Sequence, residues 1–261
     1  MGVDMTVTSV ITKPMLPESD VAHATQKEAV DTFNSNGFPV ASNESWLYWQ
    51  PDEYKEMLLA PKHVHALEPV IDDVCICIEN GVLKTTVTQK GVVVSTDFNS
   101  CEAFSELRHG VESSSVSLLN TAQFQQCIVI RISETQSNPL RVKCIGSVSD
   151  SGCSVVSKVI LVTEKEVKAS VTIEHVNTLN DTSVMNTSIE TMCYDRSELT
   201  LTHCFSQSKS PTFFHSILHM FEASQCTHIT YVDRSAIMRH DTAAHFHAED
   251  ATLKLQGIAL L

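Results

Sequence analysis

Two histidines near the end of the sequence have the spacing of metal ligands on a β-strand. His245 and His247 are separated only by Phe246, so both imidazoles point to one face of an extended strand. Stacked turns would bring His219 and His240 close to them. A stable metal centre takes three or four ligands and a supporting shell, so the pair alone predicts no metal site. A metal-dependent β-fold enzyme that uses His245 and His247 with one further ligand is the alternative interpretation.

The cysteines form no recognisable reactive or metal-binding motif. Cys75 and Cys77 have one residue between them, where redox and zinc motifs have two, and buried cysteine is common as a small core residue. The nine cysteines are an odd and scattered set, and residues 1–16 lack the basic start and apolar run of an export signal. We therefore expect a reducing compartment, the cytoplasm.

Motifs of nucleophilic and phosphate chemistry are missing from the sequence. It has no Gly-x-Ser-x-Gly elbow, no cysteine with basic neighbours that would lower its pKa, and no Gly-x-x-x-x-Gly-Lys-[Ser/Thr] loop. His175 and His203, with Tyr231 one turn further on, are most simply a ladder of stacked side chains. We therefore expect no catalytic or cofactor-binding residue, and a protein that is not itself an enzyme.

The composition predicts a folded protein that avoids polyanions. The 261 residues are 43% hydrophobic, enough to form a core, and 31 acidic against 18 basic side chains give a formal charge of −13. No basic cluster interrupts this balance, so we expect neither nucleic acid nor an anionic membrane surface as a partner. No stretch approaches the apolar length that spans a bilayer, which predicts a soluble protein.

The elements that carry these side chains repeat between residues 145 and 261. Apolar residues in β-type runs recur at intervals of 28, 28, 28 and 26 residues. They are Ile145, Ile173, Leu201, Ile229 and Leu255, and a second column contains Leu161, Ile189, Ile217 and Ala244. Such a period is typical of stacked units that bury their apolar faces against each other, and it predicts a parallel β-helix. Leu201 and Ile229 should face the interior, and Thr200 and Thr202 should face outward.

The local sequence favours strands joined by corners. Residues 168–175 and 198–203 have β-branched or apolar side chains at every second position. The segments 177–183, 206–211 and 233–235 are rich in Asn, Asp, Ser and Pro, which suit turns. An antiparallel sandwich with evenly spaced strands is the other architecture that this pattern leaves open.

A small helical region precedes the repeats. We expect a flexible leader over residues 1–18, an N-terminal helical region over 19–68 and a β-helix core over 69–261 that is incomplete at its carboxy terminus. The first helix should begin at Ser19 or Asp20, whose side chains can cap free N–H groups.

Other local signals lie between that helix and the repeats. The first helix should end near Gly37, and a short helix should occupy residues 51–59. Trp46 and Trp49 are best explained as part of a small satellite core. Asn80-Gly81 between two apolar runs predicts a type I′ hairpin, since that turn needs positive φ at both central positions.

Several motifs along the chain resemble, in their order and spacing, those of one protein family. They are Asn43-Glu44-Ser45-Trp46-Leu47-Tyr48 after Gly37-Phe38-Pro39, the stretch 117–122 before a β-run, Val171-Thr172-Ile173-Glu174-His175 followed by Asn180-Asp181, Ile237-Met238-Arg239-His240-Asp241-Thr242, and the stretches 248–255 and 257–260. Over residues 25–261 the chain resembles the SufB/SufD family of iron-sulfur cluster assembly scaffolds, and the SufD branch most. Arg234-Ser235 stands where that family usually has a Gly-Gly pair.

The resemblance implies a fold, a role and partners. It implies a helical arm and a right-handed parallel β-helix that serves as a non-enzymatic scaffold subunit of the SUF iron-sulfur cluster assembly machinery. A SufB-like paralogue would pair through the β-helix, and a SufC-like ATPase would dock on helices at the far carboxy terminus. In the family, those helices and the proposed cluster-ligand histidine come after the part that corresponds to Leu261, so neither is assigned to a residue here.

The same resemblance sets expectations about cofactors and assembly. We expect no firmly bound cofactor, and an iron-sulfur cluster only within a larger complex. Because Leu255, Ile258 and Leu260 should form an apolar edge on the last turn, we expect them to associate with the paralogue or with a second copy of the chain, as a homodimer.

Overall fold

Two β-sheets face each other across a shared core in the computed structural model, which describes residues 21–38, 52–64, 69–72, 74–96, 115–147, 151–206, 208–235 and 237–260. The strands of the described part are β1 (Val70–Ile71), β2 (Ile76–Glu79), β3 (Val82–Thr86), β4 (Val92–Ser95), β5 (Cys127–Ile132), β6 (Leu140–Gly146), β7 (Ser154–Thr163), β8 (Lys168–Asn177), β9 (Val184–Cys193), β10 (Glu198–Phe205), β11 (Thr212–Met220), β12 (Gln225–Asp233), β13 (Met238–Phe246) and β14 (Thr252–Leu260). Its helices are α1 (Val21–Asn36), α2 (Asp52–Leu58) and α4 (Ser115–Gln123).

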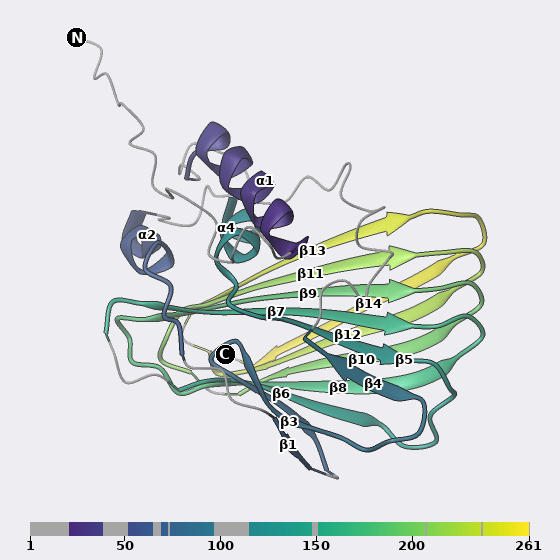
Figure 1. Ribbon diagram of the computed structural model, residues 1–261. Coiled ribbons are helices and arrows are strands. Elements are labelled where there is room, and N and C mark those ends of the chain that lie inside the picture. The colour runs from purple at the N-terminus through teal and green to yellow at the C-terminus, as the bar shows by residue number, and fades with distance from the viewer. Residues whose placement is uncertain are drawn as a thin grey trace.

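From β5 onward the chain alternates between the two sheets. One sheet has the order β13-β11-β9-β7-β5-β4 and the other β1-β3-β2-β6-β8-β10-β12-β14 (Figure 1). Strands of successive turns pair in parallel, as β7 does with β9 and β8 with β10. The described chain is therefore a mainly β protein, a parallel β-helix of about five turns with a small helical region. This confirms the predicted fold class and excludes the antiparallel sandwich.

The interior of the β-helix is filled by the inward side chains of both sheets. Residues at every second position of each strand enter one continuous apolar cluster. Leu201 on β10 is completely buried there, while its neighbours Thr200 and Thr202 are half-buried on the other face. These three positions agree with the sequence prediction.

The predicted inward position of Ile229 is wrong. Val142 pairs with Ile173 and Leu201 pairs with His228, so the offset between turns is 31 residues in one place and 27 in another. An odd offset moves a residue to the opposite face of its strand, because side chains alternate with period two. A constant step of 28 residues therefore leads from Ile145, which faces outward, into the core and out again at Ile229.

The second predicted column is wrong for the same reason. Ile189 pairs with Val159 and Ser216, and not with Leu161 and Ile217. Leu161 and Ile189 belong to the interior cluster, whereas Ile217 lies on the outer face of its sheet. The repeat is real, but its length varies from turn to turn.

Antiparallel strands begin the β-helix. Strands β2 and β3 form the hairpin predicted at Asn80-Gly81, where φ is 52° and 78°. A Cβ atom on Gly81 would lie 2.0 Å from the carbonyl oxygen of Val156, so only glycine fits this close approach. At the other sheet, β4 pairs antiparallel with β5.

Helices cover the outer face of the β13-β11-β9-β7 sheet (Figure 1). Helix α1 ends at Asn36, and Gly37 follows with a φ of 73°, as the sequence predicts. The rings of Tyr54 on α2 and Phe213 on β11 meet edge to face at 5.8 Å, and both belong to a second apolar cluster with α1 and α4. Trp46, Trp49 and the segment 1–18 lie outside the described residues.

The two kinds of corner between strands differ in length. The corners 164–167, 194–197 and 221–224 each have four residues, with φ of 62° at Glu166, 55° at Arg196 and 51° at Ala223. The N–H group of Glu166 donates to the carbonyl of Asp195 in the next turn, and the same contact recurs along the stack. On the opposite side the connections 147–153, 178–183, 206–211 and 234–237 vary in length.

Replacing Leu201 with aspartate tests the assigned faces. Leu201→Asp places an unpaired carboxylate inside the apolar cluster, and we expect it to lower the free energy of unfolding by more than about 4 kcal/mol. The matched control, Thr202→Asp, puts the same charge on the outer face and should cost about 1 kcal/mol or less. Urea unfolding followed by circular dichroism measures both, and equal losses would contradict the assignment.

Candidate functional site

Two groups of polar side chains occupy opposite faces of the β-helix wall. The inner histidine row consists of His175, His203, His228 and His240, whose side chains point into the core. The outer relay consists of Lys158, Glu190, His219, His245 and His247 on the outer face of the helix-covered sheet. Both groups combine titratable side chains with burial, so they are the candidates for function.

The inner histidine row is a chain of close ring contacts. His175 Nε2 lies 3.1 Å from His203 Nδ1, and the ring of His175 stacks on that of Phe205 at 4.1 Å. The ring of His228 is 4.9 Å from that of His203 and 5.9 Å from that of His240. Residues from both sheets therefore meet along the axis of the β-helix.

Burial keeps the inner histidine row neutral. It lowers the pKa of His175 to about 3, with a further contribution from His240. Burial likewise lowers the pKa of His228 and of His240 to about 4, and that of His203 well below its ordinary value. Neutral rings of this kind pack as aromatic side chains and act as weak hydrogen-bonding groups. His228 Nε2, for example, is 3.0 Å from Ser216 Oγ.

The outer relay runs from a buried ion pair to the surface. Lys158 Nζ lies 3.4 Å from Glu190 Oε2, and the side chains of both are less than a tenth exposed. His219 Nε2 donates to Glu190 Oε1 at 3.0 Å, and its Nδ1 lies 3.0 Å from Nε2 of the exposed His247. His245, the direct partner of His219 in the β11–β13 ladder, has its ring 5.2 Å away.

The charges of the outer relay are set by its neighbours. Burial alone would raise the pKa of Glu190, but the ammonium group of Lys158 and the hydrogen bond from His219 hold it below its ordinary value. Burial and His219 lower the pKa of His245 and of His247, so both imidazoles are neutral at pH 7. The relay thus pairs an ionised carboxylate with neutral imidazoles.

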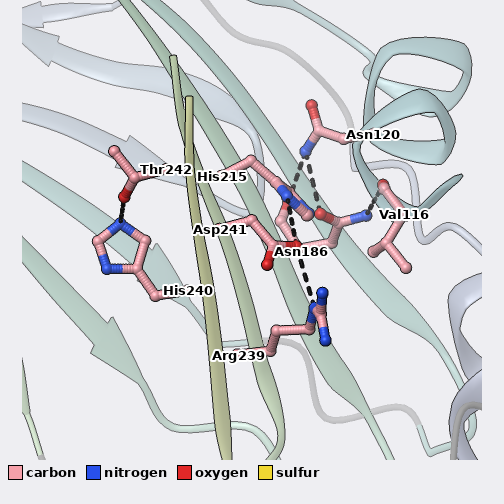
Figure 2. Close-up of polar contacts among 8 residues, drawn as sticks. All are labelled: Val116, Asn120, Asn186, His215, Arg239, His240, Asp241 and Thr242. Carbon is pink, nitrogen blue, oxygen red and sulfur yellow. Dashed lines mark hydrogen bonds and ion pairs between the residues drawn. The ribbon is translucent and has the colours of Figure 1, made fainter. Parts of the chain in front are cut away.

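A second polar contact chain lies nearby on the same outer face (Figure 2). Arg239 Nε donates to Asp241 Oδ2 at 3.0 Å, and His215 Nδ1 is 3.7 Å from the same oxygen. Asn186 connects this region to α4, because the Asn120 amide donates to the Asn186 carbonyl at 2.9 Å. These contacts tie helix α4 to the sheet and have a structural role.

The structure brings together some of the histidines that the sequence singled out. His219 does lie beside His245 and His247, as stacked turns predict. His240 does not, because it points to the inner face, where its Nε2 is 2.9 Å from Thr242 Oγ1 (Figure 2). Among the described residues, no three His, Cys, Asp or Glu side chains are arranged to hold a metal ion together.

The predicted ladder is correct for one pair and wrong for the third residue. His175 and His203 contact each other, although their strands are offset so that His203 pairs with Ile173. Tyr231 pairs with Cys204 and Ile258 on the outer face of its sheet, so it is not part of the row.

Lys158 and Glu190 were missed by the sequence analysis. Each is a charged residue within a run of strand residues that are all buried, 154–163 for Lys158 and 184–193 for Glu190. Buried charges need partners, so two charged residues in adjacent buried strands are the available signal for an ion pair. The pairing register of β7 and β9 was needed to join them.

A shallow groove on the other sheet carries a different surface. It has a volume of about 320 Å³ and crosses the first residues of β8, β10, β12 and β14. Lys168 and Glu198 at its rim pair with each other at 2.6 Å, and Thr200 and Thr227 add hydroxyl groups. Its charged pair is satisfied internally, so the groove carries less chemistry than the outer relay.

The fold and the two polar groups define a parallel β-helix with a histidine-lined interior and a histidine-carboxylate surface site. A scan against protein-family models and a search of curated proteins find no match for this chain. Within the described residues, no helix is long and apolar enough to span a membrane.

The inner histidine row predicts acid lability. The unfolded chain binds protons at these imidazoles below pH 6.5, whereas the folded chain does so only near pH 3 to 4. Stability is therefore fully present above pH 6.5 and falls as the pH drops below it. Between pH 6.5 and 5, each fully buried imidazole should cost on the order of 2 kcal/mol. Thermal unfolding at a series of pH values measures this slope.

A variant identifies the source of the slope. His175→Phe keeps an aromatic ring against Phe205 and removes one titrating group, so we expect a shallower loss of stability with acid. His23→Ala on α1 is the control and should leave the slope unchanged. A melting temperature that is flat from pH 7 to 5 would contradict neutral burial of the row.

Proposed function

We propose that this chain is a non-enzymatic scaffold subunit of the SUF iron-sulfur cluster assembly machinery, of the SufD type, that binds protein partners through its β-helix in the cytoplasm. The observation that carries the proposal is the placement of the motifs that resemble the SufB/SufD family. Val171 to His175 lie in β8, Met238 to Thr242 in β13, and 257–260 in β14. The motifs therefore fall on separate turns of a fold that the resemblance implies.

The last described turn supports a partner-binding role. β13 and β14 are the outermost strands of their sheets, and their backbone edges offer hydrogen bonds to another chain. Large apolar side chains are exposed beside them: Leu255 is 56% exposed, Ile258 59% and Leu260 48%. Apolar side chains next to an open strand edge suit a protein surface, so we assign this end to the SufB-like paralogue.

Scaffolding is also consistent with the chemistry of the described residues. The buried charged groups Lys158 and Glu190 neutralise each other, and the inner histidine row is held neutral. In this proposal ATP hydrolysis belongs to the SufC-like ATPase, and an iron-sulfur cluster is held only in the assembled complex.

Co-purification tests the proposal. The chain is co-expressed with the SufB-like and SufC-like proteins of its source organism, and we expect the tagged paralogue to retain it at a one-to-one ratio. Light scattering of the purified complex gives its composition. If the three proteins are folded but elute separately at micromolar concentration, the scaffold assignment is wrong.

Edge variants locate the pairing surface. Ile258→Lys with Leu260→Lys adds charge to the exposed face of β14 and should weaken co-purification at least tenfold, since charge at a strand edge opposes pairing. Thr200→Lys, on the outer face of β10 away from that edge, is the matched control and should leave binding unchanged. Equal binding by both variants would place the interface elsewhere.

A further inference from the structure

We propose that the outer relay is a binding site for a divalent transition-metal ion, which takes the place of the proton between His219 Nδ1 and His247 Nε2. The protein supplies two imidazole nitrogens, and water completes the coordination. This inference is independent of the scaffold role, because it concerns the side chains of one sheet face and needs no partner protein.

The spacing of the two nitrogens fits a shared ion. His219 Nδ1 and His247 Nε2 are 3.0 Å apart. A zinc ion at 2.0–2.1 Å from each of two nitrogens in tetrahedral geometry separates them by about 3.3 Å. The two rings lie within 18° of parallel, and His247 is exposed. A rotation of the His247 side chain that adds a few tenths of an ångström is therefore enough to admit the ion.

Glu190 selects the nitrogen that His219 offers. Its carboxylate accepts the Nε2–H of His219, which leaves the lone pair of Nδ1 directed at His247. Histidine ligands of metals usually donate their second nitrogen to a carboxylate in this way. Lys158 lies behind Glu190 at 3.4 Å and keeps it ionised, so the tautomer of His219 is fixed before any ion binds.

His245 gives the site a third imidazole close by. Its Nε2 is buried and makes no hydrogen bond among the described residues, and its ring is 5.2 Å from His219 and 6.4 Å from His247. In the structure the three rings do not converge on one point, so the site is an open one with two protein ligands. Imidazole ligands favour copper, nickel and zinc over magnesium and calcium.

The competing explanation is an ordinary hydrogen bond. In that case His247 Nε2–H donates to His219 Nδ1, and the relay only anchors the end of β13 to β11. Such a pair needs its proton and has no preference among cations. The two explanations differ in whether the full chain, stripped of metal, takes up one equivalent of a transition-metal ion.

Calorimetric titration separates the explanations. The full chain, with any purification tag removed and treated with chelator, is titrated at pH 7.5 with Zn²⁺ and with Cu²⁺. We expect one equivalent of each to bind, with Cu²⁺ the tighter, and no binding of Mg²⁺. The electron paramagnetic resonance spectrum of the Cu²⁺ form should show nitrogen ligands. Absence of a one-to-one transition with both ions would overturn the proposal.

Variants assign the ligands. His247→Ala alters an exposed residue and should abolish the stoichiometric site, while His23→Ala on α1 should bind as the wild-type chain does. Glu190→Gln should weaken Zn²⁺ binding 10- to 100-fold, as is typical when the group that orients a ligand is changed. Circular dichroism verifies that each variant is folded. A His247→Ala chain that binds metal as tightly as the wild type would also overturn the proposal.

Discussion

The parallel hydrogen-bond ladder between successive turns is the constraint on which every other feature depends. It fixes which residue of one turn lies beside which residue of the next, and with it the face to which each side chain points. The pairing of Phe214 with His240 and of His215 with Asp241 sends adjacent residues to opposite sides of one wall. An apolar interior and a polar outer relay can therefore share the same strands.

The ladder also explains why polar groups are tolerated at such depth. Inside, imidazoles contact one another and the ring of Phe214, and burial removes their charge. Outside, Lys158 and Glu190 keep their charges because each neutralises the other and a histidine completes the hydrogen bonding. The two faces solve the same problem of desolvation by different means, neutrality in one case and pairing in the other.

The sequence was sufficient for the architecture and insufficient for the register. The alternation of apolar residues and an approximate period identify stacked strands, and Asn80-Gly81 and Gly37 mark local turns through their backbone needs. The register depends on corner lengths that differ between turns, so Ile229 was placed on the wrong face. Handedness, partners and function stay predictions, since they rest on the family resemblance.

The unequal corners divide the molecule into a conserved-length side and a variable one. On the four-residue side, left-handed residues such as Ala223 stack with backbone contacts from turn to turn, so an added residue would break several turns at once. The opposite connections already differ in length without disturbing the ladder, as at 178–183 and 234–237. That side is where a peptide epitope or a fluorescent reporter can be inserted while both sheets keep their pairing.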